Sequence, residues 1–134
     1  STAALPGVSP LRLLLVEDHA DTARTLARML RAKGFAVHAA GDVASAIAAV
    51  ELEHFDVLVS DLGLPDGDGY EVMRAVRARC LVPGIAMSGY GMEEDVLRSA
   101  DAGFTEHLVK PINVTHLIDA IRRVTDHRGG PPKA

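Results

Sequence analysis

The sequence predicts an α/β fold, in which five parallel strands form one doubly wound sheet and five helices cover both of its faces. Three observations support this prediction. Short apolar runs are typical of strands buried on both faces, and they alternate with segments whose apolar residues recur at helical spacing. Polar residues also follow the apolar runs, at the carboxyl ends of the expected strands, where ligands of such sheets bind.

The strands are expected over 11–16, 35–40, 55–60, 85–87 and 106–109. The first helix is predicted over 21–33, because its apolar residues share one face: Ala23, Leu26, Ala27 and Leu30. Further helices are predicted to start near Val43, Tyr70, Glu93 and Val114. The segment 62–69 is rich in glycine, proline and aspartate and is expected to be a loop. Right-handed crossovers leave few ways to wind such a sheet, and a flavodoxin-like sheet with strand order 2-1-3-4-5 is expected.

Length and composition indicate one globular domain. The chain has 134 residues and a formal net charge of -4, so direct contact with nucleic acid is not expected. The single cysteine, Cys80, fits a reducing cytosol, and a cytoplasmic location without membrane contact is expected. Residues 11–125 are predicted as the domain, with 1–10 as a linker or cloning remnant and 126–134 as a flexible tail.

Polar residues at the carboxyl ends of the expected strands form the candidate site. Glu17 and Asp18 follow the first strand, Asp61 the third, Ser88 the fourth and Lys110 the fifth. Three neighbouring carboxylates repel one another unless a cation lies between them. Mg²⁺ prefers such oxygen ligands and often binds a substrate phosphate as well. Asp18 and Asp61 are the expected direct ligands of this ion.

The same residues allow phosphoryl chemistry at Asp61. A carboxylate can accept a phosphoryl group to give an acyl phosphate. Mg²⁺ and Lys110 supply positive charge, and the Ser88 hydroxyl can donate to a phosphoryl oxygen. Glu17 could act on the metal through a water, and the backbone carbonyl of Gly63 is a further candidate ligand.

Together these motifs resemble the receiver domains of response regulators in two-component signalling. The resemblance covers residues 11 to about 124 and rests on Val16-Glu17-Asp18, on the run from Val59 to Gly67, on Met87-Ser88-Gly89 and on Val109-Lys110-Pro111. It implies that Asp61 accepts a phosphoryl group from a phosphohistidine on a histidine kinase or phosphotransfer domain. It also implies that Glu17, Asp18, Asp61 and the Gly63 carbonyl arrange Mg²⁺ (or Mn²⁺), and that the peptide before Pro111 is cis.

The resemblance carries further expectations about context. The domain itself is expected to catalyse only its own phosphorylation and dephosphorylation, and a dimer through the fourth helix, fifth strand and fifth helix is possible. The sequences after Asp61 and Ser88 resemble receiver domains at the C-terminus of bacterial hybrid sensor histidine kinases, whose parent chain can be membrane-attached. A free-standing regulator and a degenerate docking module are the alternatives. An aspartyl-phosphate phosphatase is disfavoured, because Gly63 stands where such an enzyme needs a second acid.

Two residues depart from the common receiver pattern. Ser88 replaces a commoner threonine but keeps the hydroxyl. His107 stands where the family often has tyrosine or phenylalanine as a switch coupled to that hydroxyl, so the switch is expected to be altered or sensitive to protonation. A half-buried histidine without a switching role is the alternative.

Two other residues near the site have open interpretations. His19 is interpreted as a surface histidine at a helix start, with contact to metal or phosphate as the alternative. Tyr90 is interpreted as either a gate or a loop aromatic.

Each site residue also has an ordinary structural explanation when it is taken alone. Asp61 and Asp18 can cap the helices that follow them, Ser88 can belong to a turn, and Lys110 can be a solvated surface residue. Helix caps, however, do not explain a lysine at the matching strand end. The whole set therefore favours a metal and phosphoryl site.

Overall fold

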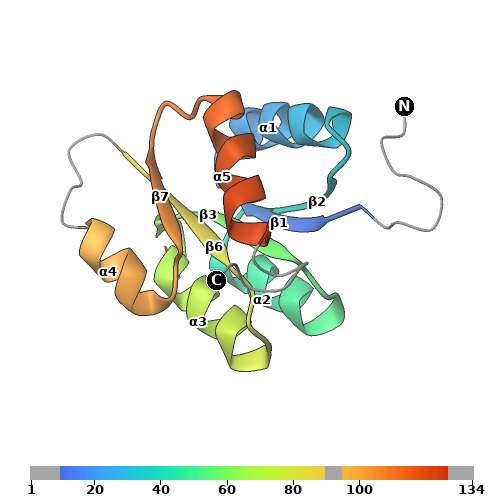
Figure 1. The fold of residues 1–134 in the computed structure, drawn as a ribbon. Coiled ribbons are helices and arrows are strands. Elements are labelled where there is room, and N and C mark those ends of the chain that lie inside the picture. The colour runs from blue at the N-terminus through green and yellow to red at the C-terminus, as the bar shows by residue number, and fades with distance from the viewer. Residues whose placement is uncertain (1–9, 90–94, 127–134) are drawn as a thin grey trace, which may run out of the picture.

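The computed structural model describes residues 10–89 and 95–126 of the chain (Figure 1). Tyr90, the predicted start of the fourth helix at Glu93, and nearly all of both predicted linker segments lie outside these residues. None of the described helices combines the length and apolarity needed to cross a lipid bilayer.

Five parallel strands form the central sheet in the order β2-β1-β3-β6-β7. Their bounds are Arg12–Val16 for β1, Ala36–Ala40 for β2, Val57–Asp61 for β3, Gly84–Ser88 for β6 and Glu106–Val109 for β7. Because β6 and β7 are the fourth and fifth long strands, the predicted order 2-1-3-4-5 is confirmed. The strand order reverses beside β1 and β3, which is where ligands bind in open sheets of this kind.

Helices cover both faces of the sheet, as Figure 1 shows. One face carries α1 (Ala20–Ala32) and α5 (Val114–Asp126), and the other carries α2 (Val43–Leu52), α3 (Gly69–Arg79) and α4 (Asp95–Ala102). Alternate residues of β1 separate the two cores: Leu13 and Leu15 pack with α1 and α5, whereas Leu14 and Val16 pack with α2 and α3. Burial on both faces explains the continuous apolar runs in the sequence.

The segment 62–69 is more ordered than the sequence predicted. Two short strands, β4 (Gly63–Leu64) and β5 (Gly67–Asp68), pair antiparallel, so the expectation of a plain loop was wrong. The turn between them presents Asp66, whose carboxylate accepts hydrogen bonds from the backbone N–H groups of Val43 and Ala44 at 2.7 and 3.0 Å. This contact fixes the segment after Asp61 to the start of α2.

Asp68 is the N-cap of α3. Its carboxylate accepts from the backbone of Glu71 at 3.0 Å, and the Glu71 side chain accepts from the backbone of Asp68 at 3.1 Å. This reciprocal capping box satisfies two N–H groups that the helix itself leaves unpaired. The capping role that the sequence left open for Asp61 therefore belongs to Asp68.

Replacing Asp68 with alanine should lower the free energy of unfolding by about 1 kcal/mol, because the helix loses its N-terminal acceptor. Urea unfolding monitored by circular dichroism measures this effect. The matched variant Asp101→Ala, at an exposed position in α4, should change stability by less than about 0.5 kcal/mol. Equal effects of the two substitutions would show that the cap contributes nothing measurable.

Candidate functional site

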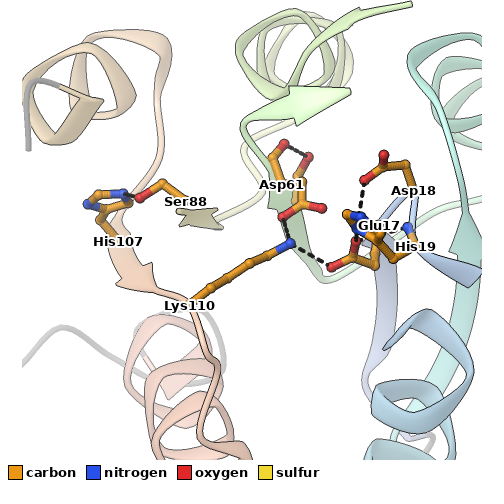
Figure 2. A network of polar contacts seen from close by, with 8 residues as sticks. Glu17, Asp18, His19, Asp61, Ser88, His107 and Lys110 are labelled. Atoms are coloured by element: carbon orange, nitrogen blue, oxygen red, sulfur yellow. Dashed lines mark hydrogen bonds and ion pairs between the residues drawn. The ribbon is translucent and has the colours of Figure 1, made fainter. Parts of the chain in front are cut away.

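The predicted polar residues meet at the carboxyl edge of the sheet, as Figure 2 shows. Backbone hydrogen bonds to neighbouring strands hold the segments that carry them. The N–H of Glu17 donates to Ala40 at 3.0 Å, and that of Lys110 donates to Ser88 at 2.8 Å. The N–H of Leu62, directly after Asp61, donates to Met87 at 2.9 Å. The site is thus built on the sheet, which positions side chains more precisely than a free loop does.

Lys110 joins the two buried acids of the site. Its ammonium nitrogen lies 2.7 Å from Asp61 Oδ1 and 3.0 Å from Glu17 Oε1. The Glu17 side chain is fully buried and that of Asp61 is 5% exposed. Because burying charges without partners is costly, this lysine is what makes two neighbouring carboxylates tolerable here. The peptide between Lys110 and Pro111 is cis, as the resemblance implied.

The second carboxylate oxygen of Asp61 is buried and has no hydrogen-bond partner among the described residues. Such orphaned oxygens are uncommon and often mark a place for an ion or a reacting group. A hard divalent cation with oxygen ligands suits this atom and the acids beside it. The donor set therefore fits Mg²⁺, with Glu17 and Asp18 as the neighbouring carboxylates.

Burial and mutual contact shift the pKa values of the two buried acids in opposite directions. Burial, reinforced by the neighbouring Glu17, raises the pKa of Asp61 to about 7, against the opposing effect of Lys110. Burial also acts to raise the pKa of Glu17. It is outweighed by hydrogen bonds with Asp61, the His19 backbone and Lys110, which together lower that pKa to about 2. Without metal, Asp61 is therefore the one of these two carboxyls that takes up a proton first as the pH falls.

The pKa of Lys110 is raised. Burial alone would lower it, but the hydrogen bonds and charges of Asp61 and Glu17 outweigh burial. The lysine therefore stays cationic at neutral pH and is available to pair with additional negative charge at Asp61.

Asp18 and His19 form the open side of the site. The imidazole Nδ1 of His19 lies 3.1 Å from Glu17 Oε2 and 3.4 Å from Asp18 Oδ1. His19 is also the N-cap residue of α1, and its side chain is 73% exposed. It is therefore both a surface histidine at a helix start and a neighbour of the acids. Ligand atoms of all three residues lie within 4.8 Å of one another.

Ser88 and His107 form a second pair beside the acids. The Ser88 hydroxyl and His107 Nε2 are 2.7 Å apart, and Ser88 is buried. In Figure 2 the hydroxyl is directed toward the imidazole and away from Asp61. The structure thus brings together the two residues that the sequence proposed as a switch. Ser88 and Asp61 are not in hydrogen-bond contact in this arrangement.

Gly63 and Gly69 both lie in the segment that follows Asp61. Gly63 opens β4 and is exposed, and no described contact joins it to the acids, so its role as a carbonyl ligand stays a prediction. Gly69 was not singled out from the sequence. A side chain at that position would meet the carbonyl oxygen of Asp61 and lie 3.0 Å from the Ser60 hydroxyl. A glycine directly after a helix-capping aspartate was the only sequence signal for this close approach.

Comparison with known proteins gives one consistent family. Residues 13–122 match the family model described as response regulator receiver domain. Transcriptional regulatory protein PdtaR of Mycobacterium tuberculosis is 34% identical over 113 residues, which cover 84% of this chain and 55% of that protein. Transcriptional regulatory protein TcrA of the same species is 35% identical over 125 residues, which cover 92% and 49%. The chain spans about half the length of these two curated relatives.

Solved structures give the same result. A response regulator receiver domain protein from Methanospirillum hungatei JF-1 superposes with a TM-score of 0.84 at 28% identity, over 90% of this chain and 97% of that one. The receiver domain of a sensor histidine kinase from Pseudomonas aeruginosa PAO1 gives a TM-score of 0.78 at 30% identity, over 88% and 99%. That structure has a magnesium ion coordinated in its active site cleft.

Proposed function

The chain belongs to the receiver-domain family of two-component response regulators, and from this premise we propose that Asp61 accepts a phosphoryl group from a phosphohistidine. One observation carries the proposal. Asp61 ends β3 at the ligand-binding edge of the sheet, with one oxygen bound to Lys110 and the other buried without a partner among the described residues. A capping or purely structural aspartate has no need of such an arrangement.

Glu17, Asp18 and Asp61 are the residues that would hold Mg²⁺ or Mn²⁺, with the Gly63 carbonyl as a further ligand. When bound, the ion neutralises negative charge on the carboxylates and on the phosphoryl oxygens. This charge would favour the ionised form of Asp61, whose pKa is raised to about 7 in the metal-free protein. Asp61 is then ionised and its oxygens are available as nucleophiles.

In the proposed reaction a carboxylate oxygen of Asp61 attacks the phosphorus of a phosphohistidine. A phosphorus–oxygen bond forms as the phosphorus–nitrogen bond breaks, and the electron pair of the broken bond stays on the departing nitrogen. The imidazole, which carries a proton on its other nitrogen, leaves in its neutral form. Lys110 is close enough to Asp61 to pair with the added charge, since their atoms already lie 2.7 Å apart.

A groove next to the acids suits the protein that carries the phosphohistidine. The cavity is about 850 Å³ in volume and lies between α1 and the segment after Lys110. Both polar and apolar residues line it, and Met29 is 44% exposed. A histidine kinase or phosphotransfer domain that docks on this groove would bring its phosphohistidine close to Asp61. We propose this surface as the contact for the phosphoryl donor.

Acetyl phosphate with Mg²⁺ tests the proposal, because it supplies the phosphoryl group without a partner protein. Intact mass spectrometry should show the gain of one phosphoryl group, and the gain should disappear when EDTA removes the metal. Absence of any gain across a range of acetyl phosphate concentrations would contradict the proposal. Catalytic turnover of small phosphate esters would instead support a phosphatase.

Mg²⁺ binding should tighten as the pH rises toward about 7, because the ion displaces the proton from Asp61, whose pKa is raised to about 7. Below that pH the apparent affinity should rise by up to about tenfold per pH unit, and above it the affinity should level off. Isothermal calorimetry at several pH values measures the profile. An affinity that stays constant between about pH 5.5 and 7.5 would contradict the assignment of the proton.

The free energy of unfolding of the metal-free protein should fall as the pH rises, whereas the Mg²⁺ affinity rises. The folded pKa of Asp61 lies above its unfolded value, so the proton stabilises the folded state at low pH. That contribution is lost as the pH rises through about 7. Glu17, with a pKa lowered to about 2, contributes in the reverse sense and does not change in this window. The difference between the native protein and Asp61→Asn isolates the effect of Asp61 from that of the histidines.

For biological context, we propose that the domain belongs to a hybrid sensor histidine kinase. The 30% identity to the receiver domain of a sensor histidine kinase supports this context. The similarity to transcriptional regulatory proteins supports the alternative of a regulator with its own output. Sequencing the complete gene decides between them, because a kinase core and an output domain have different motifs.

A further inference from the structure

His107 provides a hydrogen bond that a phenylalanine at the same position lacks. Its Nε2 lies 2.7 Å from the Ser88 hydroxyl. Ser88 ends β6 and is 4% exposed, whereas His107 is half-buried on the neighbouring strand β7. The bond therefore joins the strand end beside Asp61 to the edge strand of the sheet.

The pleat of β7 places His107 on the same face as Ser88. Glu106 pairs with Arg123 of α5, and Leu108 packs in the core between the sheet and α1 and α5. Because side chains alternate along a strand, His107 lies on the opposite face, toward α3 and α4. Ala86, two residues before Ser88, belongs to the core on that face as well. The imidazole and the Glu106 carboxylate thus lie on opposite faces of the sheet.

We propose that His107 is a positioning residue that restrains Ser88, holding its hydroxyl away from Asp61 until the phosphoryl group is present. The inference rests on the proposed function, since Ser88 has a task only if Asp61 is phosphorylated. To donate to a phosphoryl oxygen, the Ser88 side chain must turn from His107 toward Asp61. The hydrogen bond to Nε2 is the contact that this rotation breaks.

The direction of the effect does not depend on which atom carries the hydrogen. If the hydroxyl donates to Nε2, its single proton is already in use. If Nε2–H donates to the hydroxyl oxygen, that oxygen is still held beside the imidazole, on the side away from Asp61 in Figure 2. In both cases the bond favours the state without phosphoryl contact, and an effector that moves His107 would release Ser88.

Removing the bond should therefore favour the phosphorylated arrangement. A net hydrogen bond of ordinary strength corresponds to a change of about fivefold in an equilibrium constant. In His107→Leu the buried Ser88 hydroxyl is left without a partner, and this cost further favours its rotation toward a phosphoryl group. His107→Gln places an amide near the position of Nε2 and should preserve the restraint.

The experiment is a double-mutant cycle read out by binding. Beryllofluoride, a mimic of the phosphoryl group on a carboxylate, is titrated in the presence of saturating Mg²⁺ by isothermal calorimetry. The variants are His107→Leu and His107→Gln, each made with Ser88 present and with Ser88→Ala. Circular dichroism checks that all variants are folded, and Mg²⁺ affinity checks that the acids are unchanged.

His107→Leu should tighten beryllofluoride binding about fivefold when Ser88 is present and have no effect in the Ser88→Ala background. His107→Gln should remain close to the native affinity. An equal change in both backgrounds, weaker binding in His107→Leu, or a glutamine variant that behaves like leucine would each overturn the restraint. Failure of the native protein to bind Mg²⁺ and beryllofluoride would instead overturn the proposed function itself.

Discussion

Replacing Asp61 with asparagine should abolish the mass gain that acetyl phosphate and Mg²⁺ produce in the native protein. An amide oxygen is a far weaker nucleophile than a carboxylate and cannot form the same acyl phosphate. The substitution also removes one negative ligand from the metal site, so Mg²⁺ binding should weaken at least tenfold (about 1.4 kcal/mol). Intact mass spectrometry and calorimetry measure the two effects.

The loss of phosphorylation in Asp61→Asn should not arise from unfolding of the variant. Because the pKa of Asp61 is raised to about 7, its ionisation is unfavourable in the folded, metal-free protein. A neutral asparagine avoids this cost, so Asp61→Asn in EDTA should be at least as stable as the native protein at about pH 8. Thermal unfolding gives this comparison. If Asp61→Asn were neither phosphorylated nor as stable as the native protein, the loss of phosphorylation could not be attributed to the missing nucleophile.

Asp101→Asn is the matched control, because this aspartate is exposed on α4 and outside the site. It should be phosphorylated to the same extent as the native protein. Phosphorylation of Asp61→Asn at the native level would show that another residue accepts the phosphoryl group. Peptide mapping of the product would then identify that residue.

The sequence allowed the sheet and its order to be predicted because burial on both faces leaves a clear pattern. Apolar runs such as Val57, Leu58 and Val59 have no solvent-facing positions, and all three residues are fully buried. The polar residues after such runs must lie at one edge of a parallel sheet. The clustering of Asp61, Glu17 and Lys110 therefore followed from topology before any distance was known.

The contacts within the site could not be predicted in the same way. Whether Lys110 pairs with Asp61 alone or with Glu17 as well depends on side-chain distances, and the structure shows both pairs. The structure also shows that the Glu17 side chain is fully buried against Lys110, and its action on the metal through a water stays a prediction. The hydrogen bond between Ser88 and His107 likewise needs the register of β6 and β7, in which Ala86 lies opposite His107.

The short segment after Asp61 was the least predictable part of the fold. Its glycines, proline and aspartates indicated a loop, because these residues favour turns in general. The two-residue strands β4 and β5 are too short to leave a periodic pattern. The Asp66 contact with α2 joins residues 22 and 23 positions apart in the sequence. The close approach of Gly69 to Asp61 depends on how the segment between them folds back. Only the folded arrangement reveals that this segment supports the site.

Replacing Gly69 with alanine should destabilise the protein strongly and disturb the site at the same time. An added Cβ would meet the carbonyl oxygen of Asp61 and lie 3.1 Å from its carbonyl carbon. Backbone atoms cannot rotate away as a flexible side chain can, so α3 or the end of β3 must shift. Overpacking of this kind costs about 2–3 kcal/mol, which corresponds to a fall in Tm of about 10 °C.

Gly63→Ala is the matched control on the same segment. A Cβ at that position has no atom within 4 Å, so the substitution should change the free energy of unfolding by less than about 0.5 kcal/mol. It also retains the backbone carbonyl proposed as a metal ligand, and Mg²⁺ affinity should be preserved. Gly69→Ala, in contrast, should weaken Mg²⁺ binding even under conditions where it is fully folded, because its clash displaces the backbone of Asp61. If the two alanine variants had the same stability and the same Mg²⁺ affinity, the contact of Gly69 with Asp61 would have no role in placing the carboxylate.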